Sequence, residues 1–170
     1  MELGRSREHD QAPGGPPGDG SKDPSGDAQR GAPGGVAGGS GRVLVCDDAE
    51  QIRRLIRVNL EIEGYDVVEA VDGEEALEIL EDMTQPLPDV ITVDVVMPRR
   101  DGWWMVAAIR ADPRLAHIPI VMVTASAQDQ DRAKAERAAV DEFVAKPFDP
   151  YELVIKIGTL VSGQAPEAPV

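Results

Sequence analysis

Cysteine is nearly absent from this sequence: Cys46 is the single one among 170 residues, which excludes an internal disulfide framework. Long apolar runs are absent as well. No segment approaches the roughly 18 apolar residues of a membrane-spanning helix, and the first residues lack the apolar core of about 7–15 residues that a secretory signal peptide requires. From these absences we expect a cytoplasmic protein that does not insert into a membrane.

Positive charge is also scarce, because 17 basic residues face 31 acidic ones and the formal net charge is −14. Four basic and six acidic residues lie in residues 1–41, so residues 42–170 carry the remaining −12. A domain this acidic repels a phosphate backbone, which argues against direct binding to DNA or RNA.

Large apolar side chains are missing from most of residues 1–41, which contain twelve glycines and five prolines. Such a segment cannot bury enough apolar surface to offset the conformational entropy that it would lose on ordering. We therefore expect a disordered, Gly/Pro-rich extension over residues 1–41, one folded domain over residues 42–161 and a flexible C-terminal tail over residues 162–170.

Within the folded region, short β-branched runs alternate with amphipathic segments. Strands are expected at residues 42–48, 65–70, 88–94, 118–126 and 142–146, and helices at 49–64, 72–82, 102–112, 128–140 and 149–161. Asp72 and Asp149 are predicted N-caps, with Pro150 at a first helical position. This alternation predicts an α/β fold with a five-stranded parallel sheet covered by helices on both faces, and the strand order that we expect for it is the doubly wound, flavodoxin-like order 2-1-3-4-5.

Polar residues end several of these apolar strands. Asp47 and Asp48 close the first strand, Asp94 the third, Thr124 the fourth and Lys146 the fifth. Open α/β sheets bind ligands at this carboxyl edge, and the first and third strands are neighbours in the predicted order. Three carboxylates at such short distances from one another repel each other unless a cation lies among them. A set of oxygen ligands favours Mg²⁺, with Mn²⁺ as the alternative ion.

The charges at this edge also suit a covalent phosphoryl group. If Asp94 is phosphorylated, it loses its own charge and gains about −2. Mg²⁺ and Lys146 would then nearly neutralise the phosphoryl group and the two remaining aspartates, which is what phosphoryl transfer requires. Aspartate is a known type of covalent phosphoryl acceptor.

The segments "VCDD", "DVVMPRRDGW", "VTA" and "KPF" occur in this order at the predicted strand ends. Together they resemble the receiver domain of two-component response regulators, in its stand-alone form, over residues 42–161. The resemblance implies that Asp94 is the phosphoacceptor. It also implies that Asp48 binds the metal directly, Asp47 largely through water, and Val96 through its backbone carbonyl.

The same resemblance assigns the remaining site residues. Thr124 corresponds to the hydroxyl that hydrogen-bonds the phosphoryl group, and Lys146 to the charge-pairing lysine, with a cis peptide bond between Lys146 and Pro147. Phe143 corresponds to an aromatic side chain whose rotamer reports phosphorylation. A plain core position is the alternative interpretation of Phe143.

The resemblance further implies a phosphoacceptor signalling role. A sensor histidine kinase or a histidine phosphotransfer protein would supply the phosphoryl group. The surface of the fourth helix, fifth strand and fifth helix would then change for an unknown output protein or for phosphorylation-dependent homodimerisation. The domain would be no enzyme beyond catalysing its own phosphorylation and slow dephosphorylation.

Two departures from the family pattern stand out. Val96 is apolar where many relatives carry a polar side chain that helps to orient a hydrolytic water, so we expect slow self-dephosphorylation. Ala139 stands where relatives usually have glycine, so the turn after the fourth helix is expected to differ if a left-handed residue is needed there.

Competing interpretations remain open at this stage. Asp47 and Asp48 are also candidate N-caps for the first helix. A Mg²⁺-dependent aspartyl phosphatase of the haloacid-dehalogenase-like type also uses strand-end aspartates, although "CDDAE" lacks the DxD pattern of that class. Neither G-x-x-x-x-G-K-[ST] nor G-x-G-x-x-G follows the first strand, which argues against a nucleotide site.

Overall fold

A computed structural model describes residues 40–125 and 129–163, and for residues 129–132 it describes the backbone only. Almost all of the predicted disordered extension and most of the predicted C-terminal tail lie outside these residues. Within the described part of the chain, no helix is long and apolar enough to cross a membrane.

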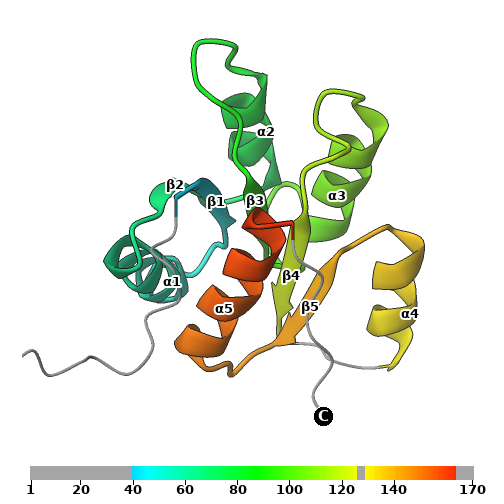
Figure 1. Ribbon diagram of the computed structural model, residues 1–170. Coiled ribbons are helices and arrows are strands. Elements are labelled where there is room, and N and C mark those ends of the chain that lie inside the picture. The colour runs from blue at the N-terminus through cyan, green and yellow to red at the C-terminus, as the bar shows by residue number, and fades with distance from the viewer. Residues whose placement is uncertain (1–39, 126–128, 164–170) are drawn as a thin grey trace, which may run out of the picture. The chain divides into compact units, whose positions relative to one another are not determined.

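Five parallel strands form one sheet in the order β2-β1-β3-β4-β5, with helices between them (Figure 1). The strands are β1 (Arg42–Cys46), β2 (Asp66–Ala70), β3 (Val90–Val93), β4 (Ile120–Thr124) and β5 (Glu142–Ala145). The helices are α1 (Glu50–Ile62), α2 (Gly73–Glu81), α3 (Gly102–Ala111), α4 (Asp129–Arg137) and α5 (Pro150–Val161). The predicted fold class and strand order are confirmed.

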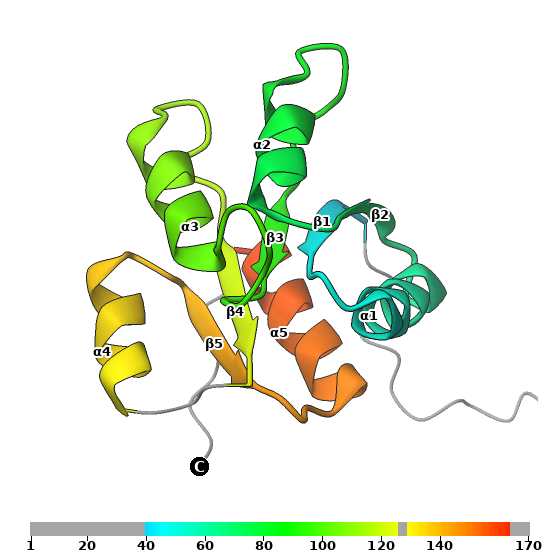
Figure 2. The same ribbon diagram turned by 180° about the vertical axis from the view of Figure 1, so that it is seen from behind.

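Two apolar clusters cover the two faces of the sheet, since successive strand side chains point to opposite faces. Leu44 and Cys46 of β1 pack with residues of α2 and α3, whereas Val43 and Val45 pack with residues of α1 and α5. Figures 1 and 2 show α1 and α5 on one side of the sheet and α2, α3 and α4 on the other. The inner strands β1, β3 and β4 are buried on both faces, which explains their nearly continuous apolar sequences, whereas the edge strands β2 and β5 are only partly buried.

Aspartate side chains begin three of the helices. Asp72 accepts hydrogen bonds from two backbone N–H groups of α2, Asp101 from one of α3, and Asp149 from one of α5, where Pro150 follows. The two predicted caps are therefore confirmed. The alternative interpretation of Asp47 and Asp48 as N-caps of the first helix is wrong, because Ala49 is the N-cap residue of α1.

The turn after α4 contains Ala139 in the left-handed region, with φ 56°. The Val140 N–H donates to the Ala135 carbonyl and the Ala139 N–H to the Glu136 carbonyl, which is the Schellman arrangement. The Ala139 carbonyl in turn accepts a hydrogen bond of 2.9 Å from Arg110 Nε. Alanine thus adopts a conformation that glycine adopts without steric cost.

We predict that Ala139→Gly stabilises the protein by about 1 kcal/mol, because it relieves the left-handed strain of the β-carbon. Urea denaturation should show a higher midpoint at an unchanged slope. The matched control is Ala133→Gly, at an exposed position of the same helix, which should lower the free energy of unfolding by about 1 kcal/mol. Equal effects of the two substitutions would contradict the prediction.

Candidate functional site

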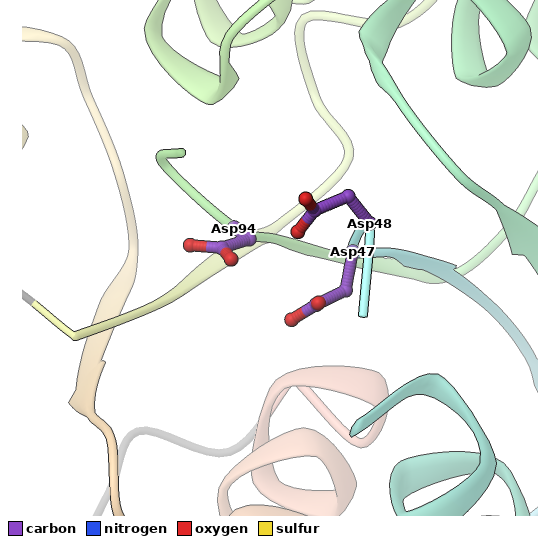
Figure 3. Close-up of side chains that lie close together, drawn as sticks. All are labelled: Asp47, Asp48 and Asp94. Atoms are coloured by element: carbon purple, nitrogen blue, oxygen red, sulfur yellow. The ribbon is translucent and has the colours of Figure 1, made fainter. Parts of the chain in front are cut away.

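Three aspartates meet at the carboxyl edge of the sheet. Asp47 and Asp48 follow β1 and Asp94 follows β3, and one carboxylate oxygen of each lies within 4.8 Å of the others (Figure 3). Cys46 and Val93 are paired in register, and the Asp94 N–H donates to the Cys46 carbonyl at 2.9 Å. The acids that follow these two strands therefore leave the sheet at the same level.

Burial differs among the three acids. The side chains of Asp47 and Asp94 belong to residues only 2% and 6% exposed, whereas Asp48 is exposed. Burial raises the pKa of Asp47 above its ordinary value, against the opposing effect of hydrogen bonds from Lys146 and the Ala49 N–H. Negative charge is thus held at this site at a cost in desolvation.

Lys146 bridges the two buried acids. Its Nζ donates to Asp47 Oδ2 at 2.6 Å and to Asp94 Oδ2 at 2.7 Å. Burial alone would lower the pKa of Lys146, but the hydrogen bonds and charges of both carboxylates outweigh it, so the pKa is raised. The ammonium group is therefore charged at neutral pH.

The charges do not balance. Three carboxylates face one ammonium group, so the cluster retains an excess of two negative charges when all are ionised. Carboxylate oxygens are ligands for hard divalent cations, and a carboxylate cluster of this kind favours binding of one. The residues present therefore fit a divalent metal ion.

A tight loop follows Asp94. Asp94 Oδ1 accepts a bond of 3.3 Å from the Val96 N–H, and the Gly102 N–H donates to the Val95 carbonyl at 3.0 Å. A β-carbon on Gly102 would overlap the Asp94 carbonyl oxygen. The first residue of α3 must therefore be glycine for the backbone of Asp94 to keep its place.

Of the other predicted site residues, Val96 lies in the loop after β3, Thr124 on β4, Phe143 on β5 and Lys146 directly after β5. Thr124 is fully buried at the end of β4, and its carbonyl accepts a bond of 2.8 Å from the Lys146 N–H. The peptide bond between Lys146 and Pro147 is cis. Phe143 on β5 is half-buried and packs against the apolar cluster that also contains Met122. The exposed residue Val96 presents its side chain to solvent, with 67% exposure.

One polar pair beside the site was not found by sequence reasoning. Arg99, in the loop after β3, donates from Nε to Asp72 Oδ2 at 2.5 Å. The sequence pattern predicts Asp72 only as a helix cap and predicts no role for Arg99. The two residues are 27 positions apart, and no local pattern indicates that they touch.

Comparisons with known proteins agree with this geometry. The sequence model described as response regulator receiver domain matches residues 43–158. The chain is 37% identical over 120 residues to the DNA-binding dual master transcriptional regulator RpaA of Synechocystis, covering 71% of this chain and 48% of that protein. It is 40% identical over 116 residues to the probable transcriptional regulator ycf27 of Guillardia theta, covering 68% and 43%.

Solved structures show the same fold. A putative response regulator from Chloroflexus aurantiacus superposes with a TM-score of 0.67 at 30% identity, covering 73% of this chain and 99% of the other. The chain spans less than half the length of the two curated relatives. The similarity therefore concerns one domain of those proteins.

We predict that Gly102→Ala weakens Mg²⁺ binding in calorimetric titration and lowers the free energy of unfolding by about 1–3 kcal/mol, because the new methyl group displaces the backbone of Asp94. The control is Gly64→Ala, where φ is 93° in the turn after α1. It should cost about 1–2 kcal/mol of stability yet leave the Mg²⁺ affinity of the folded protein unchanged. Unaltered Mg²⁺ affinity in Gly102→Ala would refute the prediction.

Proposed function

We propose that Asp94 is the residue that takes the phosphoryl group. The chain belongs to the response regulator receiver domain family, and it therefore has a phosphoacceptor role in two-component signalling. The observation that carries this assignment is the position of Asp94 between two further acids and the Lys146 ammonium group. The haloacid-dehalogenase-like phosphatase alternative finds no support in the family match.

Hydrogen bonding favours Asp94 over Asp47. Both carboxylate oxygens of Asp47 are engaged, at 2.6 Å with Lys146 and at 2.9 Å with the Ala49 N–H. Asp94 has one short bond to Lys146, and among the residues that the structure describes its Oδ1 accepts the 3.3 Å bond from the Val96 N–H. An oxygen with a long hydrogen bond loses little when it attacks phosphorus.

The proposed donor is a phosphohistidine on a sensor histidine kinase or a histidine phosphotransfer protein. An Asp94 oxygen forms a bond to phosphorus while the phosphorus–nitrogen bond breaks, and the histidine nitrogen keeps the electron pair. Lys146 stays beside the acceptor and offsets the charge that the phosphoryl oxygens bring.

The metal in this proposal is Mg²⁺, with Mn²⁺ as a substitute. Asp47, Asp48, Asp94 and the Val96 carbonyl would hold it, and the carboxylate cluster is the support for this ligand set. When bound, the ion supplies the positive charge that phosphoryl transfer needs.

The proposed response runs through β4 and β5. Thr124 is at the strand end next to the acceptor strand and would turn its hydroxyl to the phosphoryl group. Phe143, half-buried on β5, would move inward and change the surface of α4, β5 and α5. An output protein or a second copy of the chain would recognise that surface.

The acidic charge of this domain still argues against direct nucleic acid contact by the domain itself, whatever the relatives do with their remaining length. In this proposal the domain catalyses only its own phosphorylation and slow dephosphorylation. The cytoplasmic location inferred from the sequence stays a prediction.

We predict that incubation with acetyl phosphate and Mg²⁺ adds one phosphoryl group, detected as a mass increase of the intact protein and mapped to Asp94. Asp94→Asn should abolish the increase. The control is Asp101→Asn in the same loop, which keeps the N-cap of α3 and should be labelled like the wild type. Labelling of Asp94→Asn at the wild-type rate would sink the assignment.

A second prediction concerns the lifetime of the phosphorylated form. Val96 exposes an apolar side chain beside Asp94, and this side chain cannot orient a water for attack. Val96→Asn should therefore shorten the half-life of the phosphoryl group, whereas Val96→Leu should not. The decay of the intact-mass signal after removal of the donor measures both. Equal half-lives in Val96→Asn and the wild type would contradict this interpretation.

A further inference from the structure

The loop from Asp94 to Gly102 is anchored at three points besides its two ends. Met97 is buried, and its sulfur lies 3.5 Å from the Cys46 sulfur. The Gly73 N–H donates to the Arg100 carbonyl at 3.3 Å. The third anchor is the ion pair between Arg99 and Asp72. Two of the three anchors thus fasten the far corner of the loop to the start of α2.

The Asp72 side chain is almost completely buried, with 1% exposure. Its Oδ1 accepts bonds of 3.0 Å from the N–H groups of Glu74 and Glu75. Its Oδ2 accepts from Arg99 Nε and also pairs with Arg99 Nη2. One oxygen therefore caps α2, and the other is devoted to the loop that carries Asp94.

Arg99 occupies a backbone conformation that a residue with a side chain rarely adopts, with φ 63°. Such a residue persists only when its surroundings hold it there, and such residues gather at functional sites. The contacts that hold it are its two bonds to Asp72 and a longer pair with Glu74 at 3.3 Å. The side chain is half exposed, so the buried end of this pair is Asp72.

The electrostatic effects agree with a tight pair. Burial would raise the pKa of Asp72, but the bonds from the α2 backbone and from Arg99 outweigh it and lower the pKa. Asp72 therefore holds its negative charge more readily than an ordinary aspartate, and that charge faces Arg99.

We propose that Asp72 and Arg99 form a positioning pair that fixes the loop after β3, and with it the Val96 carbonyl, for metal binding. The proposal rests on the function proposed above, because it concerns the same site. In the part of the chain that the structure describes, neither residue has a hydrogen bond or ion pair with the three acids. They act through the backbone of residues 95–100, whose near end is closed by the Gly102–Val95 bond and whose far end they hold.

The substitutions that test the pair keep everything else as constant as the chain allows. Arg99→Gln removes the anchor and keeps a β-carbon at the left-handed position. Arg100→Gln is the matched control: it removes the same charge from the next residue, whose guanidinium lies over the Trp104 ring at 4.6 Å. Asp72→Asn keeps a good N-cap residue and loses the charge that holds Arg99.

Calorimetric titration with Mg²⁺ should show about tenfold weaker binding in Arg99→Gln and in Asp72→Asn, as for other residues that orient metal ligands. Arg100→Gln should bind Mg²⁺ like the wild type. The double variant Asp72→Asn/Arg99→Gln should be no weaker than either single one, because both remove the same contact. Arg99→Lys, which keeps the charge, should restore part of the affinity.

Phosphorylation by acetyl phosphate supplies a second readout that a purely structural role would not move. The variants should need more Mg²⁺ for half-maximal labelling, while the labelling rate at saturating Mg²⁺ stays near that of the wild type. Unfolding in urea, measured in parallel, identifies any variant that has merely lost stability.

The outcomes separate this inference from the proposed function. Wild-type labelling at Asp94 together with unchanged Mg²⁺ affinity in Arg99→Gln and Asp72→Asn would overturn the positioning pair alone, even if both variants were less stable. A wild-type protein that neither binds Mg²⁺ nor accepts a phosphoryl group would overturn the proposed function and the pair with it.

Discussion

Two buried carboxylates, Asp47 and Asp94, share one ammonium group from Lys146, and the rest of the site is arranged around this contact. Parallel pairing creates it, because β1 and β3 are neighbours and release their acids at one level, while β5 supplies the lysine across β4. Without Lys146, two buried like charges would face each other uncompensated, which is strongly unfavourable. With Lys146 present, the cluster still carries an excess of negative charge. This excess favours the binding of a cation, and it disfavours a phosphoryl group unless a cation is bound as well.

The sequence predicted the features that depend on a repeating pattern of strands and helices or on an apolar run that ends at a polar residue. Apolar runs that end on a polar residue located Asp47, Asp94 and Lys146 at one edge. Alternation of strands with helices predicted a parallel sheet, and the order 2-1-3-4-5 is one of the two common doubly wound orders. The sequence did not predict contacts between side chains that are far apart along the chain. The sequence indicated only a helix cap at Asp72, and its Oδ1 does cap α2. The bond of its Oδ2 with Arg99 could not be predicted, because only folding brings Arg99 close to Asp72. Asp47 was a candidate cap for the first helix besides a candidate metal ligand; its Oδ2 accepts from Lys146 and its Oδ1 from the Ala49 N–H, and Ala49 is the N-cap residue. The sequence located Thr124 and Phe143 on the fourth and fifth strands, but the movement proposed for them involves two conformational states, and a sequence pattern does not describe the difference between two states.

Arg99 and Ala139 are the non-glycine residues with positive φ among the residues that the structure describes. In both turns an arginine makes the compensating contact. Arg99 anchors itself to Asp72, and Ala139 is held through its carbonyl by Arg110, which also pairs with Asp141 at 2.9 Å. Long side chains thus enforce locally unfavourable backbone at the loop beside the acids and at the end of α4. The price is backbone strain, which persists because the surrounding contacts determine the geometry.

Adjacent tryptophans at the start of α3 give the molecule two built-in optical probes, and they are the only two in the chain. Trp104 is 37% exposed under the guanidinium of Arg100, next to the loop that follows Asp94. Trp103 packs against the apolar cluster, with the Lys134 ammonium group of α4 lying 4.3 Å from its ring centre. A cation over an indole ring perturbs the fluorescence emission of that ring. The emission of Trp104 therefore depends on the position of Arg100 in the loop, and the emission of Trp103 depends on the position of Lys134 in α4. Replacing Trp103 or Trp104 by phenylalanine would leave a protein with one tryptophan, whose fluorescence reports on only one of these two regions.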